Sequence, residues 1–489
     1  MTQEPNNDAR HLETLDRDLG RYSNLDKLGS YAARPMVGTG ISLAFIVLAG
    51  LVAALLFGQS TNTFIVVIAA GLGAYMALNI GANDVANNMG PAVGANALSM
   101  GGAIAIAIVF ESAGAMIAGG DVVSTIAKGI VSPESMQDAS TFIWAMMAAL
   151  LAAALWVNLA TWIGAPVSTT HSVVGGVMGA GIAAAGFAAV SWPTMTKIAA
   201  SWVISPVLGG LVAAMARNIG ADDVTAAVGR GVRALVGIMG GTFASYLALK
   251  GLKKIFKIDL TTALAIGLAI GILIWLVMIP IIRKQSIGLE NRNKSLKILF
   301  GIPLIVSAAL LSFAHGANDV ANAVGPLAAI VQASQSGDFL AAVSIPFWVM
   351  MIGAFGISFG LFLFGPKLIR MVGSQITKLN PMRAYCVALS AAITVIVASW
   401  LGLPVSSTHI AVGAVFGVGF YREWDTKRRM RKAHVELPAT ATVAPEERGH
   451  RKLVRRSHFM TIIAAWVITV PAAAILSGLI FVGINMIAG

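Results

Sequence analysis

An Asn-Asp-x-x-Asn pattern occurs twice in the chain, each time inside an apolar stretch. Residues 81–87 and residues 316–322 both read GANDVAN. In a helix, the two asparagines and the aspartate of each copy fall on one face, within an arc of about 100°. Their carboxylate and amide oxygens suit a small alkali cation, and the carboxylate can alternatively hold a proton. The residues are Asn83, Asp84 and Asn87 in the first copy and Asn318, Asp319 and Asn322 in the second.

Three successive hydroxyl side chains followed by a histidine also occur twice. APVSTTHS spans 165–172 and LPVSSTHI spans 403–410. Proline is common in the first turn of a helix and Ser and Thr are common caps, so we expect these hydroxyls at helix N-termini. Free backbone N–H groups and the positive end of the helix dipole make such a terminus an anion site. The hydroxyls are those of Ser168, Thr169, Thr170, Ser406, Ser407 and Thr408.

Both patterns have simpler interpretations. Asparagines can join membrane helices through hydrogen bonds, and hydroxyls can cap helices without a ligand. The repetition of both patterns at nearly equal spacing favours a ligand site, because packing alone would not preserve Asn and Asp in hydrocarbon. His171 and His409 end the hydroxyl motifs. They serve either as a proton relay or as neutral partners that orient the hydroxyl turn.

The charge balance of these motifs predicts symport. Two ionised aspartates and a divalent oxyanion would gather near the middle of the membrane, and neither motif contains Lys or Arg. Each unpaired charge there costs several kcal/mol. The anion is therefore tolerable only if cations, or protons on the carboxylates, enter with it.

The composition predicts the elements that position these residues. The chain has 489 residues, of which 57% are hydrophobic and 11% charged, with a mean hydropathy of +0.80. This excludes a soluble domain and predicts an all-α, polytopic membrane protein of about 10–13 membrane segments. The net charge of +12 comes largely from loop clusters such as 421–458. Such clusters are typical of cytoplasmic loops, so we expect no nucleic-acid partner.

The paired motifs divide the chain into two repeats with flanking segments. We expect a polar tail at 1–37, repeat 1 at 38–220, middle spans and basic loops at 221–296, repeat 2 at 297–420, a basic loop at 421–458 and a final membrane helix at 459–489. Gly-Pro follows each GANDVAN at the same offset, at Gly90-Pro91 and Gly325-Pro326. These pairs, and the prolines of the two hydroxyl motifs, predict interrupted or re-entrant helices at a central site.

One further acidic residue lies within a predicted span. Glu111 has an apolar Met or Gly as its expected counterpart in the second repeat, so any accessory role would be asymmetric. The single cysteine, Cys386, excludes an internal disulfide. No Cys/His cluster has metal-ligand spacing, and we expect no cofactor.

The doubled motifs resemble the signatures of the inorganic phosphate transporter (PiT) family. The resemblance rests on GANDVANNMGPAVG at 81–94, GANDVANAVGPLAA at 316–329, and the paired PVSTTH and PVSSTH. It implies a carrier with two inverted-topology repeats that moves inorganic phosphate with Na+ or H+ through the lipid bilayer, here a bacterial inner membrane. If sodium is coupled, Asp84 and Asp319 are the expected metal ligands. A homo-oligomer is compatible with the sequence.

Three alternatives stay open at this point. The same scaffold could carry sulfate or a metal–phosphate complex, since tetrahedral oxyanions present similar acceptors. A membrane phosphatase would need a nucleophile with a base, and a cationic clamp that the motifs lack, so we expect no enzyme. An anion channel would not require two buried aspartates beside its path.

The charge balance makes the aspartates testable. Asp84→Asn or Asp319→Asn should weaken or uncouple cation-driven uptake, because either change removes a negative charge that the cation compensates. Transport assays at varied cation concentration measure this. Normal uptake with unchanged cation dependence in both variants would refute the symport argument.

Overall fold

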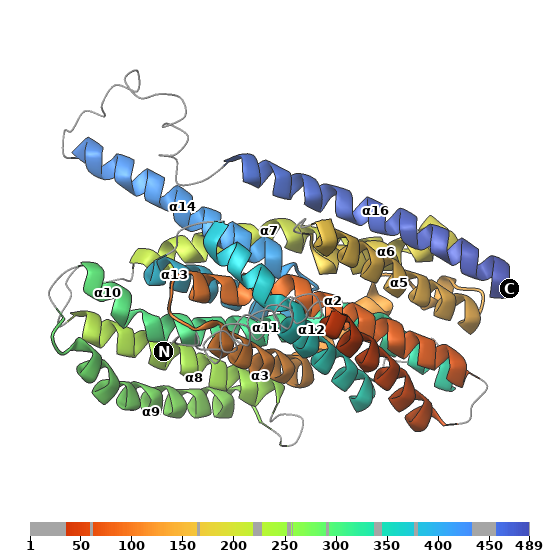
Figure 1. Ribbon diagram of the computed structural model, residues 1–489, viewed down its shortest axis with the longest axis horizontal. Coiled ribbons are helices and arrows are strands. Elements are labelled where there is room, and N and C mark those ends of the chain that lie inside the picture. The colour runs from red at the N-terminus through yellow and green to blue at the C-terminus, as the bar shows by residue number, and fades with distance from the viewer. Residues whose placement is uncertain are drawn as a thin grey trace, which may run out of the picture.

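A computed structural model describes most of the chain and is almost entirely helical (Figure 1). It describes residues 36–58, 62–163, 167–218, 227–251, 256, 258–289, 293–336, 345–375, 380–432 and 456–488. Within these residues no strand forms, and 10 helices are long and apolar enough to cross a membrane. The predicted all-α, polytopic architecture is confirmed, at the lower end of the expected number of segments.

The helix bounds follow the chain order. After a first helix, Met36–Phe57, the elements are α2 (Thr63–Gly94), α3 (Met100–Ala118), α4 (Gly120–Ser124), η1 (Thr125–Gly129, a π-helix), η2 (Pro133–Ser135), α5 (Ala139–Ile163), α6 (Thr169–Ala185), η3 (Phe187–Ala189), α7 (Trp192–Asn218), α8 (Ala227–Lys250), α9 (Leu260–Ser286), α10 (Asn293–Leu299), α11 (Gly301–Ser336), α12 (Phe347–Gln375), α13 (Pro381–Trp400), α14 (Ser407–Lys432) and α16 (Arg456–Ala488).

The two GANDVAN motifs lie inside long, uninterrupted helices. Helix α2 continues through Pro91 and α11 continues through Pro326. The break predicted at each Gly-Pro is therefore wrong. A proline removes only one backbone hydrogen bond, and neighbouring helices in a membrane bundle compensate for that loss.

The interruption predicted at the two hydroxyl motifs is present. Helix α5 ends at Ile163 and α6 begins at Thr169, while α13 ends at Trp400 and α14 begins at Ser407. Within each pair the two helices pack against each other, so each pair forms a helical hairpin with the hydroxyl motif at its tip. Pro166, which precedes the first motif, lies outside the described residues. Figure 1 shows α5 and α6 toward one end of the molecule and α13 and α14 toward the other.

Helices α2 and α12 approach each other so closely that only glycine fits between them. A Cβ on Gly360 would overlap the carbonyl oxygen of Leu78, and one on Gly81 would overlap that of Ile357. Glycine at the contact is typical of tightly packed membrane helices. The GANDVAN segment of α2 is thus held firmly against α12.

Helix α11, which carries the second GANDVAN motif, packs against α3 of the first half in the same way that α2 packs against α12. A Cβ on Gly316 would overlap the carbonyl oxygen of Glu111, and one on Gly114 would overlap that of Phe313. Gly81 and Gly316 are the same position of the two GANDVAN motifs. Gly81 meets Ile357 and Gly316 meets Glu111, so Ile357 is the structural counterpart of Glu111. The expectation of a Met or Gly at that position was wrong.

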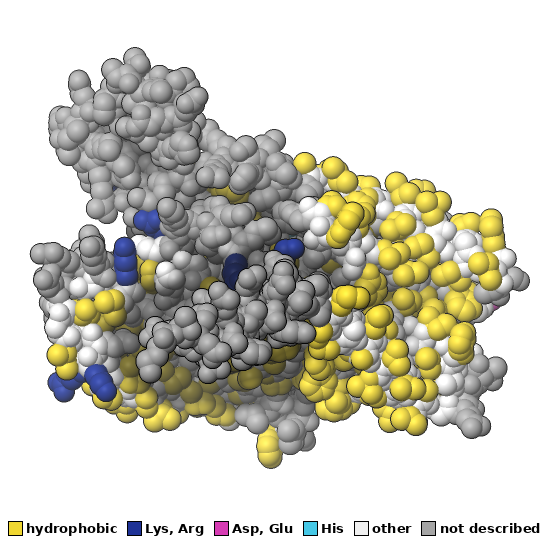
Figure 2. Space-filling view, viewed as in Figure 1, with side chains coloured by type: hydrophobic (Ala, Val, Ile, Leu, Met, Phe, Trp, Pro, Cys, Tyr) yellow, Lys and Arg dark blue, Asp and Glu magenta, His cyan; other side chains and the backbone are white. Residues whose placement is uncertain are grey.

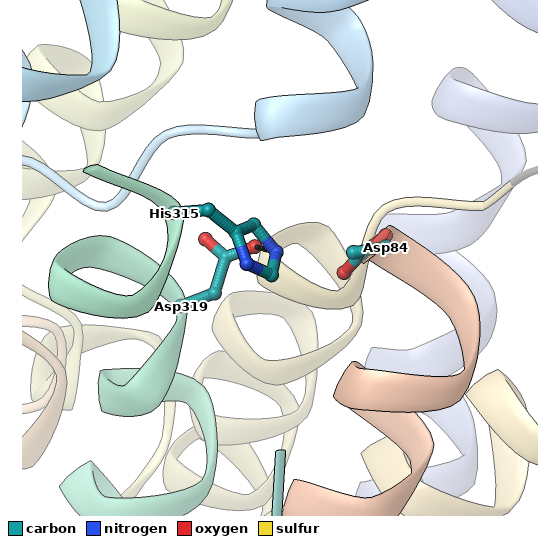
Figure 3. Close-up of side chains that lie close together, drawn as sticks. All are labelled: Asp84, His315 and Asp319. Carbon is teal, nitrogen blue, oxygen red and sulfur yellow. Dashed lines mark ion pairs between the residues drawn. The ribbon is translucent and has the colours of Figure 1, made fainter. Parts of the chain in front are cut away.

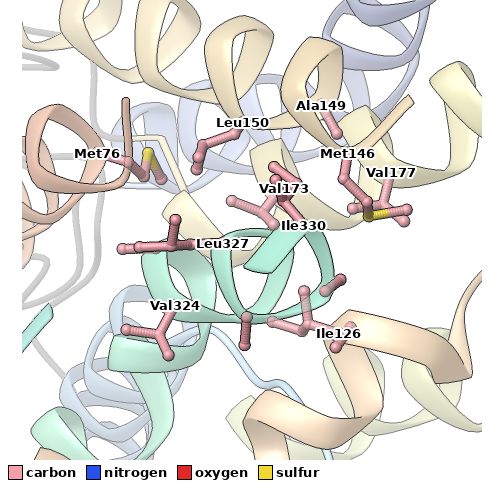
Figure 4. Packing of buried hydrophobic residues seen from close by; sticks show 14 of the residues in the cluster. Met76, Ile126, Met146, Ala149, Leu150, Val173, Val177, Val324, Leu327 and Ile330 are labelled. Carbon is pink, nitrogen blue, oxygen red and sulfur yellow. The ribbon is translucent and has the colours of Figure 1, made fainter. Parts of the chain in front are cut away.

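One buried apolar cluster packs around α11 (Figure 4). Val324, Leu327 and Ile330 of α11 belong to one buried cluster with Leu150 of α5 and Val173 of α6. Helix α5 is apolar over most of its circumference and largely buried, although Leu155 and Leu159 remain exposed. This packing fixes the first hairpin relative to the second GANDVAN helix.

The described surface agrees with a membrane protein. Figure 2 shows apolar side chains over most of the described surface, with Lys and Arg toward one end of the view. Helix α14 extends to Lys432, so the predicted loop at 421–458 begins as helix; residues 433–455, and residues 1–35 of the predicted tail, lie outside the described part.

The close helix contacts predict that replacement by alanine destabilises the protein at one glycine and not at another. Gly360→Ala should lower the unfolding temperature of the detergent-solubilised protein, because overpacking costs about 1–3 kcal/mol. Gly101→Ala in α3 is the control, since a Cβ there meets nothing within 4 Å. Equal unfolding temperatures for the two variants would contradict the packing described for α2 and α12.

Candidate functional site

The Asp84 carboxylate of α2 receives one hydroxyl from each hairpin tip. Its Oδ2 accepts a hydrogen bond from Thr169 Oγ1 at 2.7 Å, and its Oδ1 accepts one from Thr408 Oγ1 at 3.1 Å. Asp84 is 1% exposed. A single buried carboxylate therefore joins the hydroxyl motifs of both halves.

Two asparagines of the GANDVAN motifs complete this arrangement. Asn87 Nδ2 donates to Thr408 Oγ1 at 2.9 Å. Asn322 Nδ2 donates to Thr170 Oγ1 at 3.1 Å and lies 3.4 Å from Thr169 Oγ1. Each asparagine thus contacts a hydroxyl of the other half. The sequence predicted that the motifs share one site, but it did not predict these pairs.

The hydroxyl motifs begin helices, as their sequence predicts. Ser168 Oγ accepts from the backbone N–H of His171, and Ser406 Oγ accepts from that of His409, each at 3.2 Å. These bonds cap α6 and α14. The two tips also touch directly, because Thr170 Oγ1 donates to the carbonyl oxygen of Val405 at 3.0 Å.

The second aspartate has a different environment. Asp319 Oδ2 accepts from Ser407 Oγ at 3.1 Å and lies 2.8 Å from His315 Nε2. Its Oδ1, and the Oδ1 of the nearby Asn322, are buried without a hydrogen-bond partner. Such uncompensated acceptors one helical turn apart are suited to a cation.

The remaining asparagines support the hairpins. Asn318 accepts from the backbone N–H of Val405 at 3.1 Å and donates to the carbonyl oxygen of Leu403 at 3.1 Å, so it holds the second tip. Asn83 donates to Thr161 Oγ1 of α5 at 2.8 Å. Both predicted residues border the site, and their amide donors are used within the protein.

Sequence reasoning missed His315. It projects from α11 beside Asp319 and toward Asp84 (Figure 3). One ligand atom from each of these three residues lies within 4.8 Å of the others. The sequence did contain a signal for His315. The residue before GANDVAN is Ile80 in the first copy, whereas it is the polar His315 in the second.

Glu111, the expected accessory residue, reaches the site through His315. Its Oε1 lies 3.3 Å from His315 Nδ1 and accepts from Asn88 Nδ2 at 2.9 Å. An imidazole that faces carboxyl groups with both nitrogens must carry hydrogen on both, or share a proton held by a carboxyl. The network therefore provides positive charge or a proton beside Asp319, where the motifs offer neither Lys nor Arg.

The two motif histidines pack behind the hairpin tips. The rings of His171 and His409 meet edge to face with centroids 4.3 Å apart, and the Trp202 ring lies 3.8 Å from that of His171. Trp202 Nε1 donates to the carbonyl oxygen of Pro404 at 3.1 Å. This arrangement favours the interpretation that the histidines orient the hydroxyl turns.

Comparison with known proteins gives consistent matches. A family model described as the phosphate transporter family matches residues 80–477. A protein of Helicobacter pylori (strain ATCC 700392 / 26695) named "Putative phosphate permease" is 44% identical, with 96% of this chain and 99% of that protein covered. The chloroplastic inorganic phosphate transporter 2-1 of Arabidopsis thaliana is 38% identical, with 83% and 70% covered.

A solved structure titled "The sodium-dependent phosphate transporter" is similar to this chain. It is 36% identical, with a TM-score of 0.77, and the alignment covers 87% of this chain and 100% of that one.

The buried network predicts strong coupling between two side chains. His315→Ile leaves the carboxyl groups of Glu111 and Asp319 without their shared partner, which should cost about 3–5 kcal/mol of unfolding free energy. The double variant with Glu111→Ile copies Ile80 and Ile357 of the other half and should be more stable than His315→Ile alone. Thermal unfolding of both variants measures this, and simple additivity of the two losses would contradict the network.

Proposed function

We propose that this chain, which belongs to the phosphate transporter family, carries inorganic phosphate across the membrane by symport with a cation, Na+ or H+. It is an integral membrane protein. The proposal includes a bacterial inner membrane as its location, because the 44% identical relative is a Helicobacter pylori protein. It also makes the chain a carrier rather than an enzyme.

The observation that carries the proposal is the convergence of both hydroxyl motifs on Asp84. Thr169 and Thr408 come from different halves of the chain and both donate to this carboxylate. A group of neutral donors at two capped helix N-termini is suited to a tetrahedral oxyanion. The phosphate ligands in this proposal are Ser168, Thr169, Thr170, Ser406, Ser407 and Thr408.

The cation ligands in the proposal lie beside these hydroxyls. Asp84 and Asp319 provide carboxylates, and the unpartnered oxygens of Asp319 and Asn322 provide further acceptors. Two buried carboxylates cannot share a site with phosphate unless positive charge accompanies it. The solved relative is named as sodium-dependent, which makes sodium the first ion to test.

An inverted relation between the two halves fits this mechanism. The reciprocal glycine contacts of α2 with α12 and of α11 with α3 are those expected of elements related by a twofold axis. The hairpins lie toward opposite ends of the molecule in Figure 1. Movement of one half relative to the other would then expose a central site to either side in turn.

Uptake by the purified protein in proteoliposomes tests the proposal. Labelled phosphate should accumulate against its gradient under an imposed sodium or proton gradient, and the comparison of the two identifies the coupled ion. Thr169→Val should reduce uptake at least about tenfold, because it removes a donor to a charged group. Thr196→Val is the matched control, since that exposed hydroxyl of α7 bonds only its own helix, at the carbonyl oxygen of Trp192.

The same assay separates the alternatives. Unlabelled sulfate that competes as well as phosphate would favour a sulfate carrier, and equilibration without accumulation would favour a channel. No accumulation under either gradient, or an equal loss in both threonine variants, would contradict the proposal.

A further inference from the structure

The hydroxyl hydrogens of Thr169 and Thr408, at the centre of the site, already form hydrogen bonds within the protein. A threonine hydroxyl has one hydrogen to donate. Thr169 gives its hydrogen to Asp84 Oδ2, and Thr408 gives its hydrogen to Asp84 Oδ1. Neither hydroxyl can donate to phosphate while it donates to Asp84.

Neighbouring amides hold both hydroxyls in this orientation. Asn87 donates to the oxygen of Thr408 at 2.9 Å, and Asn322 approaches the oxygen of Thr169 at 3.4 Å. Each oxygen therefore receives an amide hydrogen from one side, which directs its own hydrogen toward Asp84. The result is a chain of five side chains that crosses between the halves.

Asp319 does not accept hydrogen bonds from both hairpin tips. Its Oδ2 accepts only one hydroxyl, from Ser407, and its Oδ1 has no donor. The two aspartates thus differ although their motifs are identical. Of the two aspartates, Asp84 alone accepts hydrogen bonds from both hairpin tips.

We propose that Asp84 is an internal competitor of phosphate, and that cation binding to this carboxylate releases the Thr169 and Thr408 hydroxyls to the substrate. A cation on Asp84 takes up its lone pairs and weakens it as an acceptor. The freed hydroxyls turn to phosphate, which then replaces Asp84 as the group that joins the two tips. This inference rests on the proposed function and adds an order to it: the cation binds before the anion.

The ordering has a structural reason. Hydrogen bonds between a hydroxyl and a carboxylate are charge-assisted and stronger than those between neutral groups. An anion approaching the site without a cation would have to break two of them and would also face the charge of Asp84. With the cation bound, both obstacles are reduced together.

Equilibrium phosphate binding to the full-length protein in nanodiscs tests the inference. In choline chloride at fixed pH, Asp84→Asn should bind phosphate at least about tenfold more tightly than the wild type, because it removes a negative charge and one of the two oxygens that accept the threonine hydroxyls. Asp319→Asn is the matched control. It should gain much less cation-free affinity, because it frees only the Ser407 hydroxyl while Asp84 still holds Thr169 and Thr408.

Further measurements keep the test decisive. Asp84→Ala removes the acceptor without introducing an amide, and unfolding temperatures establish that each variant is folded. In the wild type, sodium chloride added before phosphate should raise the phosphate affinity. Sodium that leaves the phosphate affinity of the wild type unchanged would overturn the inference, even if both Asp84 variants fail to fold.

Two results would overturn the inference and leave the transport function intact. One is an Asp84 variant that binds cation-free phosphate no more tightly than the wild type. The other is an equal gain in Asp319→Asn. If neither the wild type nor any variant binds phosphate in either salt, the proposed function fails as well.

Discussion

The structure depends on one buried carboxylate that must be neutralised or hydrogen-bonded to remain inside a membrane protein. Asp84 meets this requirement by accepting one hydroxyl from each of two hairpins. A lone charge at this depth would cost several kcal/mol, so the same bonds that stabilise Asp84 also hold the hairpin tips of both halves together. The close packing of α2 against α12 keeps the carboxylate in position. The same few donors thus contribute both to the stability of the protein and to the proposed recognition of an anion.

The two halves of the chain share their motifs and glycine contacts but differ in their electrostatics. Their glycine contacts are reciprocal, and their GANDVAN motifs are identical. Around Asp319, however, the structure adds His315 and Glu111, where the other half has Ile80 and Ile357. One aspartate is therefore bonded by hydroxyls alone, while the other is accompanied by a buried group that can carry positive charge. An internally duplicated carrier can in this way assign different tasks to equivalent positions.

The sequence predicted the fold class, and the structure brings most of the predicted site residues close together. Hydropathy identified an all-α membrane protein, and the duplication of both motifs predicted that they belong together. Helix continuity through Pro91 was missed because local rules overestimate the effect of one lost hydrogen bond when neighbouring helices compensate. His315 was missed because it lies just outside the repeated motif, where the first copy has Ile80. The pairing of Asp84 with Thr408 of the other half is a tertiary contact, which motif spacing does not encode.

A structure of the protein in nanodiscs, determined by electron cryomicroscopy with phosphate and the coupled cation present, tests this account most directly. The account predicts phosphate between the Thr169 and Thr408 hydroxyls, with Asp84 turned to the cation and no longer accepting from either threonine. Phosphate bound elsewhere, with both threonines still donating to Asp84, would contradict it.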